Sequence, residues 1–331
     1  MQMKFVGVAL AALLAATAAS AADVKPAVIY DIGGKFDKSF NEGTYNGALA
    51  FKKATGINFR EFEIQNEAQR EQALRRFAQD GDDPIVVPGF AWASALEKVA
   101  PDFPKTRFTI LDMVVNQPNV QSVVFKEQEG SFLVGVLAAK KSTTQKFGFV
   151  GGMDVPLIHK FGCGYAQGIK YVNPKAEVFA NMTGTTGAAW NDPVKGGELA
   201  KAQIDRGADI VYAAAGATGL GVLRAAADAG KLAIGVDSNQ NGIIPGKILT
   251  SMLKRVDIAT QNAFSSAKDG TWKAGVNVLG LKEKGVDWAL DDNNKPLVTE
   301  DMIKAVDDAK ADIIAGKIQV HDYMTDQTCP D

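Results

Sequence analysis

Short runs of β-forming residues alternate with helical segments along most of this 331-residue chain. One series of runs begins with AVIYDIGG and ends with VQSVVFK, and a second begins with KFGFVGGM and ends with LAIGVDS. Helices are expected between the runs at about residues 39–54, 67–80, 129–140, 157–171, 193–206 and 219–229, with a short one after PIVVPGF. Because parallel strands need crossover connections, the alternation predicts an α/β protein with two doubly wound parallel sheets, each covered by helices on both faces.

No Pro-, Ser- or Gly-rich linker separates the two series, so we expect two lobes joined by crossing segments rather than by a tether. ILTSMLK, residues 248–254, is interpreted as a return crossing followed by a helix over 256–268, and the chain is expected to end with a helix at 299–315 and a strand at IQVHDY. The predicted division is lobe 1 at residues 23–126 and 251–272, and lobe 2 at 127–250 and 273–331.

The first 22 residues, MQMKFVGVALAALLAATAASAA, have the parts of a secretory signal peptide. Lys4 supplies positive charge, an apolar run follows, and Ala19-Ser20-Ala21 forms a small-x-small cleavage site. A membrane anchor is the alternative, but the apolar stretch is short and rich in alanine. Because no cysteine lies near the cleavage site, the sequence predicts an exported protein that is not lipidated.

Charge and residue counts exclude several function classes. The chain has 36 Lys and Arg against 38 Asp and Glu, with no basic block, so we expect a small neutral partner and no nucleic acid. Two histidines, His159 and His321, are too few and too far apart for a zinc site or a catalytic triad. The G-x-S-x-G, H-E-x-x-H and Walker motifs are absent, so no catalytic residue, metal or cofactor is predicted. Cys163 and Cys329 form either a disulfide or two buried thiols.

The ends of the predicted strands carry carboxylates and glycines. In open parallel sheets ligands bind outside the carboxyl ends of the strands, where this chain has Asp31, Asp112, Gly216 and Asp237, together with Gly33, Gly34, Gly89, Gly151, Gly152 and Ser238. Two aromatic residues lie among polar neighbours near such turns, Phe40 in GGKFDKSFNEG and Trp190 in TGAAWNDP. Because these two rings belong to different lobes, they are predicted to grip a flat ligand from opposite sides, whereas Trp92 is interpreted as a lid on the core.

Several motifs in order, DIGGKFDKSFNEG, FKEQEGSFLVGVLAA, GFVGGMDVPLIHKFGCGYAQGI, WNDP, GVDSNQ and ILTSMLKRVD, resemble the BMP/PnrA family of substrate-binding proteins. These proteins serve ABC importers, and many bind purine nucleosides. The resemblance implies a type I periplasmic binding protein whose two Rossmann-like lobes are joined by a three-segment hinge. It also implies that Phe40 and Trp190 stack on the ligand and that Asp112 forms hydrogen bonds with its base. Asp237 and Lys254 would contact the ribose near the backbone of Gly216, and Asp31 and Asn41 would line the same pocket.

Two departures from the family pattern concern the ligand. Asn239 replaces a common Asp, and Trp190 is larger than the usual ring. The resemblance therefore predicts a periplasmic receptor for a purine nucleoside or nucleobase, working with an ABC permease in the inner membrane. We expect a monomer, because a symmetric interface would tend to obstruct closure of the lobes. A receptor for a sugar or another aromatic heterocycle, a ligand-sensing module and a secreted nucleoside-processing enzyme are the alternatives. The last of these would need a nucleophile or metal site, which the motifs do not provide.

Overall fold

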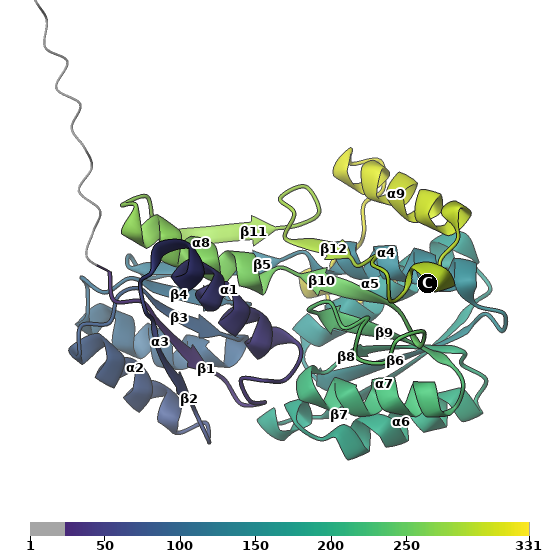
Figure 1. Cartoon of the computed structure of the whole chain (residues 1–331), viewed down its shortest axis with the longest axis horizontal. Coiled ribbons are helices and arrows are strands. Elements are labelled where there is room, and N and C mark those ends of the chain that lie inside the picture. The colour runs from purple at the N-terminus through teal and green to yellow at the C-terminus, as the bar shows by residue number, and fades with distance from the viewer. Residues whose placement is uncertain (1–23, 331) are drawn as a thin grey trace, which may run out of the picture.

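The computed structural model describes residues 24–330, which form two α/β lobes lying side by side (Figure 1). The predicted signal peptide, residues 1–22, lies outside the described residues. Each lobe is built on a six-stranded sheet. The two-series alternation predicted from the sequence therefore corresponds to two sheets.

The first sheet is parallel throughout, with strand order β2-β1-β3-β4-β5-β11. Its strands are β1 (Ala27–Tyr30), β2 (Arg60–Glu63), β3 (Ile85–Pro88), β4 (Phe108–Leu111), β5 (Val120–Phe125) and β11 (Gly275–Leu279). One face is covered by α1 (Phe40–Thr55) and α8 (Val256–Lys268), and the other by α2 (Gln69–Gln79) and α3 (Ala93–Val99). The 3₁₀ helices of this lobe are η1 (Phe90–Trp92) and η2 (Ala100–Asp102).

The second sheet repeats this order as β7-β6-β8-β9-β10-β12, and only its edge strand β12 is antiparallel to its neighbour. Its strands are β6 (Lys146–Met153), β7 (Glu177–Gly184), β8 (Ile210–Ala214), β9 (Leu232–Asp237), β10 (Ile248–Lys254) and β12 (Val286–Trp288). One face is covered by α4 (Glu127–Lys141), α5 (Pro156–Val172) and α9 (Glu300–Ile314), and the other by α6 (Pro193–Asp205) and α7 (Gly219–Asp228). The 3₁₀ helices of this lobe are η3 (Gly187–Trp190), η4 (Gly216–Thr218), η5 (Lys295–Leu297) and η6 (Tyr323–Thr325).

Burial on both faces explains why central strands such as β1 and β3 are apolar without interruption. In β1, Ala27 and Ile29 pack toward α2 and α3, whereas Val28 and Tyr30 pack toward α1 and α8. A strand of a parallel sheet that is covered on both sides has no solvent-facing position, so its sequence does not alternate between apolar and polar residues. Trp92 is fully buried in the same core, as the sequence interpretation expected.

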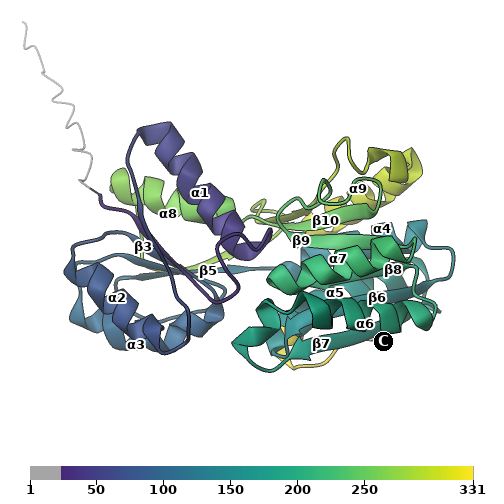
Figure 2. The ribbon, with the colours of Figure 1, turned by 60° about the horizontal axis from the view of Figure 1, so that its bottom comes forward.

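The shared strand order places equivalent crevices in the two lobes. In each sheet the order reverses beside the first strand, between β1 and β3 and between β6 and β8. Ligands of doubly wound folds bind at such switch points, outside the carboxyl ends of the strands. The lobes lie beside one another in both views (Figures 1 and 2), and the pocket described below is lined from both crevices.

The chain passes between the lobes three times, after β5, after β10 and after β11. Two crossings fall later than the predicted positions 251 and 273, because β10 belongs to the second sheet and β11 to the first. ILTSMLK is therefore a strand of lobe 2 and not a crossing. IQVHDY was expected to be a strand, and it is not one in the structure. β11 and β12 were not predicted at all.

Candidate ligand-binding site

A pocket lies between the two lobes, with an empty volume of about 660 Å³ including its mouth. All eight ligand-binding residues predicted from the sequence line it: Asp31, Phe40, Asn41, Asp112, Trp190, Gly216, Asp237 and Lys254. The volume is within the range of typical small-molecule sites. The structure thus gathers residues from the ends of strands in both sheets, as parallel topology requires.

On the lobe 1 side, Asp31 and Asn41 are held by different partners. Arg70 of α2 donates from Nη2 to Oδ1 of Asp31 over 2.7 Å, and burial still raises the pKa of this carboxyl above its usual value. The amide nitrogen of Asn41 donates to the carbonyls of Asp31 and Gly34 at 3.4 and 3.3 Å. Since that leaves Oδ1 of Asn41 buried without a partner, this oxygen can accept from a ligand.

The N-terminus of α1 is capped by a residue that sequence reasoning did not assign. The carboxylate of Asp37 accepts from the backbone N–H groups of Ser39, Asn41 and Glu42 at 2.8, 3.0 and 3.1 Å. Three such bonds fix the turn that leads into the helix. They place Phe40, the first residue of α1, at the pocket wall. An Asp shortly before a helix start is the sequence signal that could have identified this cap.

Asp112 and Asp237 occupy equivalent places in the two lobes, since Asp112 directly follows β4 and Asp237 is the last residue of β9, the strand at the same position in the second sheet. Both have a left-handed backbone, with φ of 72° and 63°. Non-glycine residues in this region cost about 1–3 kcal/mol each and gather at functional sites. Asp237 accepts from the Ser39 hydroxyl over 2.5 Å, whereas Oδ1 of Asp112 is buried without a partner.

Lys254, the last residue of β10, is almost completely buried. Its ammonium lies 2.6 Å from Oδ2 of Asp112 and 2.9 Å from Oε1 of Glu127. It also lies 5.0 Å from the centroid of the Phe40 ring. The two carboxylates hold the pKa of Lys254 above its usual value despite burial. Its ion-pair partners are thus Asp112, which lines the pocket, and Glu127, which does not.

Trp190 ends η3 and packs into lobe 2 beside two glycines. A Cβ added to Gly152 would overlap the six-membered part of its indole, and one added to Gly216 would lie 3.3 Å from the Trp190 carbonyl oxygen. Gly216 also has a left-handed φ of 58°, which favours glycine. The indole therefore needs glycine at the end of β6, and its Cβ lies near Gly33 of the opposite lobe.

Further apolar residues of the lining were missed. Phe90 follows Gly89 after β3, and Leu157, Ile158 and Phe161 lie on α5. Positions 157, 158 and 161 share one helix face, so helical spacing combined with the switch-point rule could have found them. The pocket therefore has four aromatic rings in its lining, two from each lobe.

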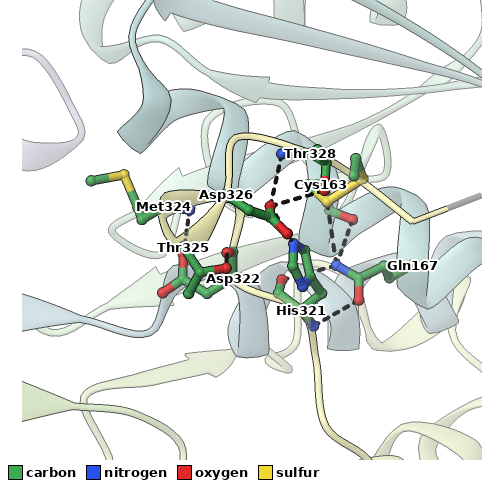
Figure 3. The surroundings of a disulfide bond; sticks show 9 residues. Cys163, Gln167, His321, Asp322, Met324, Thr325, Asp326 and Thr328 are labelled. Carbon is green, nitrogen blue, oxygen red and sulfur yellow. Dashed lines mark hydrogen bonds and ion pairs between the residues drawn. A yellow bond between two sulfur atoms is a disulfide. The ribbon is translucent and has the colours of Figure 1, made fainter.

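In residues 24–330 no group of three or more His, Cys, Asp or Glu side chains is placed to hold a metal ion. Over the same residues, no helix combines the length and the apolar character needed to cross a bilayer. Cys163 and Cys329 form a disulfide with a Cα–Cα distance of 5.5 Å, which ties the end of the chain to α5 (Figure 3).

Known proteins resemble this chain in fold and in sequence. A solute-binding protein of an ABC transporter system from Aeropyrum pernix K1 superposes with a TM-score of 0.85 at 28% identity, covering 92% of this chain and 95% of that one. The nucleoside-binding protein BmpA of an ABC transporter from Lactococcus lactis is 33% identical over 323 residues, covering 90% of this chain and 89% of its own length. The fold is thus the type I periplasmic binding fold predicted from the sequence.

The predicted localisation has to be corrected. An uncharacterized lipoprotein from Pyrococcus abyssi is 36% identical over 292 residues, covering 83% of this chain and 71% of its own length, and relatives from Pyrococcus horikoshii and Pyrococcus furiosus are also named lipoproteins. These relatives contradict the expectation of a protein that is not lipidated. That expectation depended on the absence of a cysteine near the predicted cleavage site, and this site lies outside the described residues.

The family assignment follows from the match over nearly all the described residues. The family model described as ABC transporter substrate-binding protein, PnrA-like, matches residues 24–323. Proteins of this family bind substrates for transporters and are not enzymes, which agrees with the lack of a catalytic motif in the sequence. This chain belongs to the PnrA-like family of ABC transporter substrate-binding proteins.

Proposed function

We propose that this protein binds a purine nucleoside or nucleobase between its lobes and presents it, as a monomer, to an ABC permease. The base lies between Phe40 of lobe 1 and Trp190 of lobe 2 and donates to Asp112 and Asn41. The sugar, where present, lies toward Asp237 and the backbone at Gly216. The name of the Lactococcus lactis relative, a nucleoside-binding protein, supports this choice of ligand.

The observation that carries the proposal is a pair of unpartnered acceptors in an aromatic pocket. Oδ1 of Asn41 and Oδ1 of Asp112 are both buried and have no hydrogen-bond partner, although both residues line the pocket. Buried acceptors without donors are costly, about 1–3 kcal/mol each, so a ligand that supplies N–H groups gains that energy. A nucleobase offers such donors at the edge of a flat ring.

The energies are adequate for a useful affinity. Stacking contributes about 1–3 kcal/mol per base and aromatic ring, whereas micromolar binding needs about 8 kcal/mol. Two rings therefore leave several kcal/mol to hydrogen bonds with the acceptors. Because those bonds are directional, they also discriminate between ligands that stack equally well.

Closure of the lobes is the second part of the proposal. Ser39 of lobe 1 donates to Asp237 of lobe 2, and Gln240 of lobe 2 donates to the Lys38 carbonyl at 2.9 Å. Ser238 donates to the Ser39 carbonyl at 3.0 Å. A ligand held from both sides adds to these contacts only when the lobes are together, which is the differential affinity that favours the closed form.

The test is a thermal-shift panel on ligand-stripped protein with guanosine, inosine, adenosine, the free bases, guanosine 5′-monophosphate, ribose and glucose. At a hundredfold excess over Kd, a ligand adds about 2.7 kcal/mol of stability. We expect stabilisation by nucleosides or bases and none by ribose. Isothermal titration then gives the affinities. Stabilisation by ribose or glucose alone, with no response to any purine, would show that the proposal is wrong.

A further inference from the structure

We infer that Glu127 and Lys160 are positioning residues of the ligand pocket, which hold Lys254 against Asp112 through a buried ion chain that ends at Asp322. The ion chain is defined as Asp112, Lys254, Glu127, Lys160 and Asp322. It begins at the pocket wall and ends in the C-terminal strap, defined as residues 317–330, after α9. This inference rests on the proposed function of the pocket, but its test does not require a nucleoside.

The geometry shows an unbroken series of contacts between alternating charges. Lys254 Nζ lies 2.6 Å from Asp112 Oδ2 and 2.9 Å from Glu127 Oε1. The other oxygen of Glu127, Oε2, lies 3.0 Å from Lys160 Nζ, which lies 3.3 Å from Oδ2 of Asp322. Each inner member therefore contacts two partners of opposite charge, so displacing one member changes the position and the electrostatic environment of its neighbours.

Burial raises the energetic cost of breaking any of these contacts. Glu127 is 0% exposed, Lys254 2% and Lys160 6%. Charges out of water are expensive unless each has a partner, and a pair that loses one partner leaves an uncompensated charge. Lys160 Nζ also donates to the carbonyl of Phe125 over 2.7 Å, which fixes it at the first crossing between the lobes. Glu127 and Lys160 do not line the pocket, so they act on a ligand only through Lys254.

The strap is held in place close to the outer end of the chain. Cys163 of α5 is bonded to Cys329, and Gln167 of the same helix donates to the backbone carbonyl of His321 at 3.1 Å (Figure 3). Figure 3 shows the strap running alongside α5 with Asp322 next to His321. These tethers hold the strap against α5 on both sides of Asp322 and so keep its carboxylate beside Lys160.

The charged groups that act on Asp112 come from several elements. Lys254 of β10 stabilises the ionised carboxylate, whereas Glu127 of α4 and Asp237 of β9 oppose it. Burial is the largest cause, and with the two anions it outweighs Lys254 and raises the pKa of Asp112 to about 6. Beyond Glu127, the next members of the ion chain are Lys160 of α5 and Asp322 of the strap. Removing a cation should therefore raise the pKa of Asp112, and removing an anion should lower it.

The experiment follows the Asp112 carboxyl by ¹³C NMR in ligand-free protein, with the signal assigned from Asp112→Asn. Lys160→Met should raise the titration midpoint and Glu127→Gln should lower it, each by about one pH unit. The double variant removes both charges and should titrate close to the wild type. Lys160→Arg keeps the charge and should also behave as the wild type. A general loss of structure would not produce shifts of opposite sign that cancel.

Matched controls separate the ion chain from bulk charge. Lys175→Met removes an exposed lysine just beyond α5 and should leave the midpoint unchanged. On the strap, Asp322→Asn should lower the midpoint, whereas Asp326→Asn should not. Equal shifts in the variants and their controls, or shifts of the same sign in Lys160→Met and Glu127→Gln, would overturn the inference.

Ligand binding gives the second readout. The Kd for guanosine at pH 7 should rise in Lys160→Met and return toward the wild-type value in the double variant. Oδ2 of Asp112 accepts from Lys254, so a proton gained by this carboxyl lies on Oδ1, which then presents a donor to the ligand in place of an acceptor. Failure of guanosine to bind the wild-type protein would count against the proposed function, while the titration would still decide the role of the ion chain. An unchanged Kd in Lys160→Met, with a normal wild-type affinity, would contradict the inference.

Discussion

Replacing Phe40 with alanine tests the stacking proposal most directly. Phe40 is the first residue of α1 and is only partly buried, so its ring is available to a ligand. The helix start does not depend on this side chain, because Asp37 caps the three backbone N–H groups that precede and follow it. Phe40→Ala should therefore fold normally and lose one stacking surface.

The expected magnitude follows from the energy of a single stacked base. A loss of about 1–3 kcal/mol, at 1.4 kcal/mol for each factor of ten, corresponds to a rise in Kd of roughly 5- to 150-fold. Phe40→Tyr keeps the flat ring and should lose little affinity. Phe40→Leu keeps apolar volume without a planar face and should lie between the wild type and the alanine variant.

Isothermal titration with the best ligand of the panel provides the measurement, and circular dichroism checks the fold. Phe36→Ala is the matched control, because Phe36 lies in the same turn but is 62% exposed and packs edge-on against Tyr45 at 5.6 Å. Its removal should leave Kd unchanged. If Phe40→Ala and Phe36→Ala bind the ligand equally well and as tightly as the wild type, the stacking argument is refuted.

Three further predictions concern the rest of the site and the strap. Gly152→Ala should displace the indole of Trp190, which occupies the space of an added methyl group, and should weaken binding in titrations while leaving the far-UV spectrum unchanged. Lowering the pH through about 6 should raise Kd up to tenfold per pH unit, because Asp112, whose pKa is raised to about 6, gains a proton on Oδ1, the oxygen that Lys254 does not contact, and this oxygen then donates instead of accepting; a flat profile between pH 5 and 7 would contradict its role. Replacing Cys163 and Cys329 with serine should lower the free energy of unfolding by roughly 2–5 kcal/mol in denaturant titrations, because the bond closes a long loop of 166 residues.

Strands were predictable from the sequence where both faces of a sheet are covered. β1, β3 and β4 are fully buried and apolar, so they stand out in the sequence. β11 is different, because four of its five residues are exposed, and β12 has only three residues. Neither has an apolar pattern that distinguishes a strand from a loop. Their pairing depends on the neighbouring strand, which local sequence does not reveal.

Pocket residues were predictable when they follow a strand, because parallel topology alone brings strand ends together. Asp31, Asp112 and Asp237 were found in this way. The ion chain could not be found from spacing, since Lys254 and Asp112 are 142 positions apart and Glu127 lies on a helix that is buried nearly all round. Such a helix has no polar face from which a paired carboxylate could be distinguished from a solvated one.

The N-terminus of α1 explains why an uncharged ligand suits this pocket better than a phosphate. Helix N-termini at switch points usually bind anions, because their backbone N–H groups are free. Here the carboxylate of Asp37 already accepts from three of these groups, at 2.8, 3.0 and 3.1 Å. The place where a nucleotide phosphate would dock is therefore already occupied by a carboxyl group of the protein.

The remaining ionisable groups of the pocket lining also disfavour an anionic ligand. Asp31, Asp112 and Asp237 line the pocket together with Asp37, and Lys254 is the cation among the lining residues. Arg70 offsets Asp31, and Lys254 is shared between Asp112 and Glu127, so neither cation is left to neutralise an entering anion. A phosphate would lose its hydration against carboxylates, whereas N–H and O–H donors gain acceptors. Guanosine 5′-monophosphate should therefore give no thermal shift where guanosine does, and equal shifts from the two would show that this charge argument is wrong.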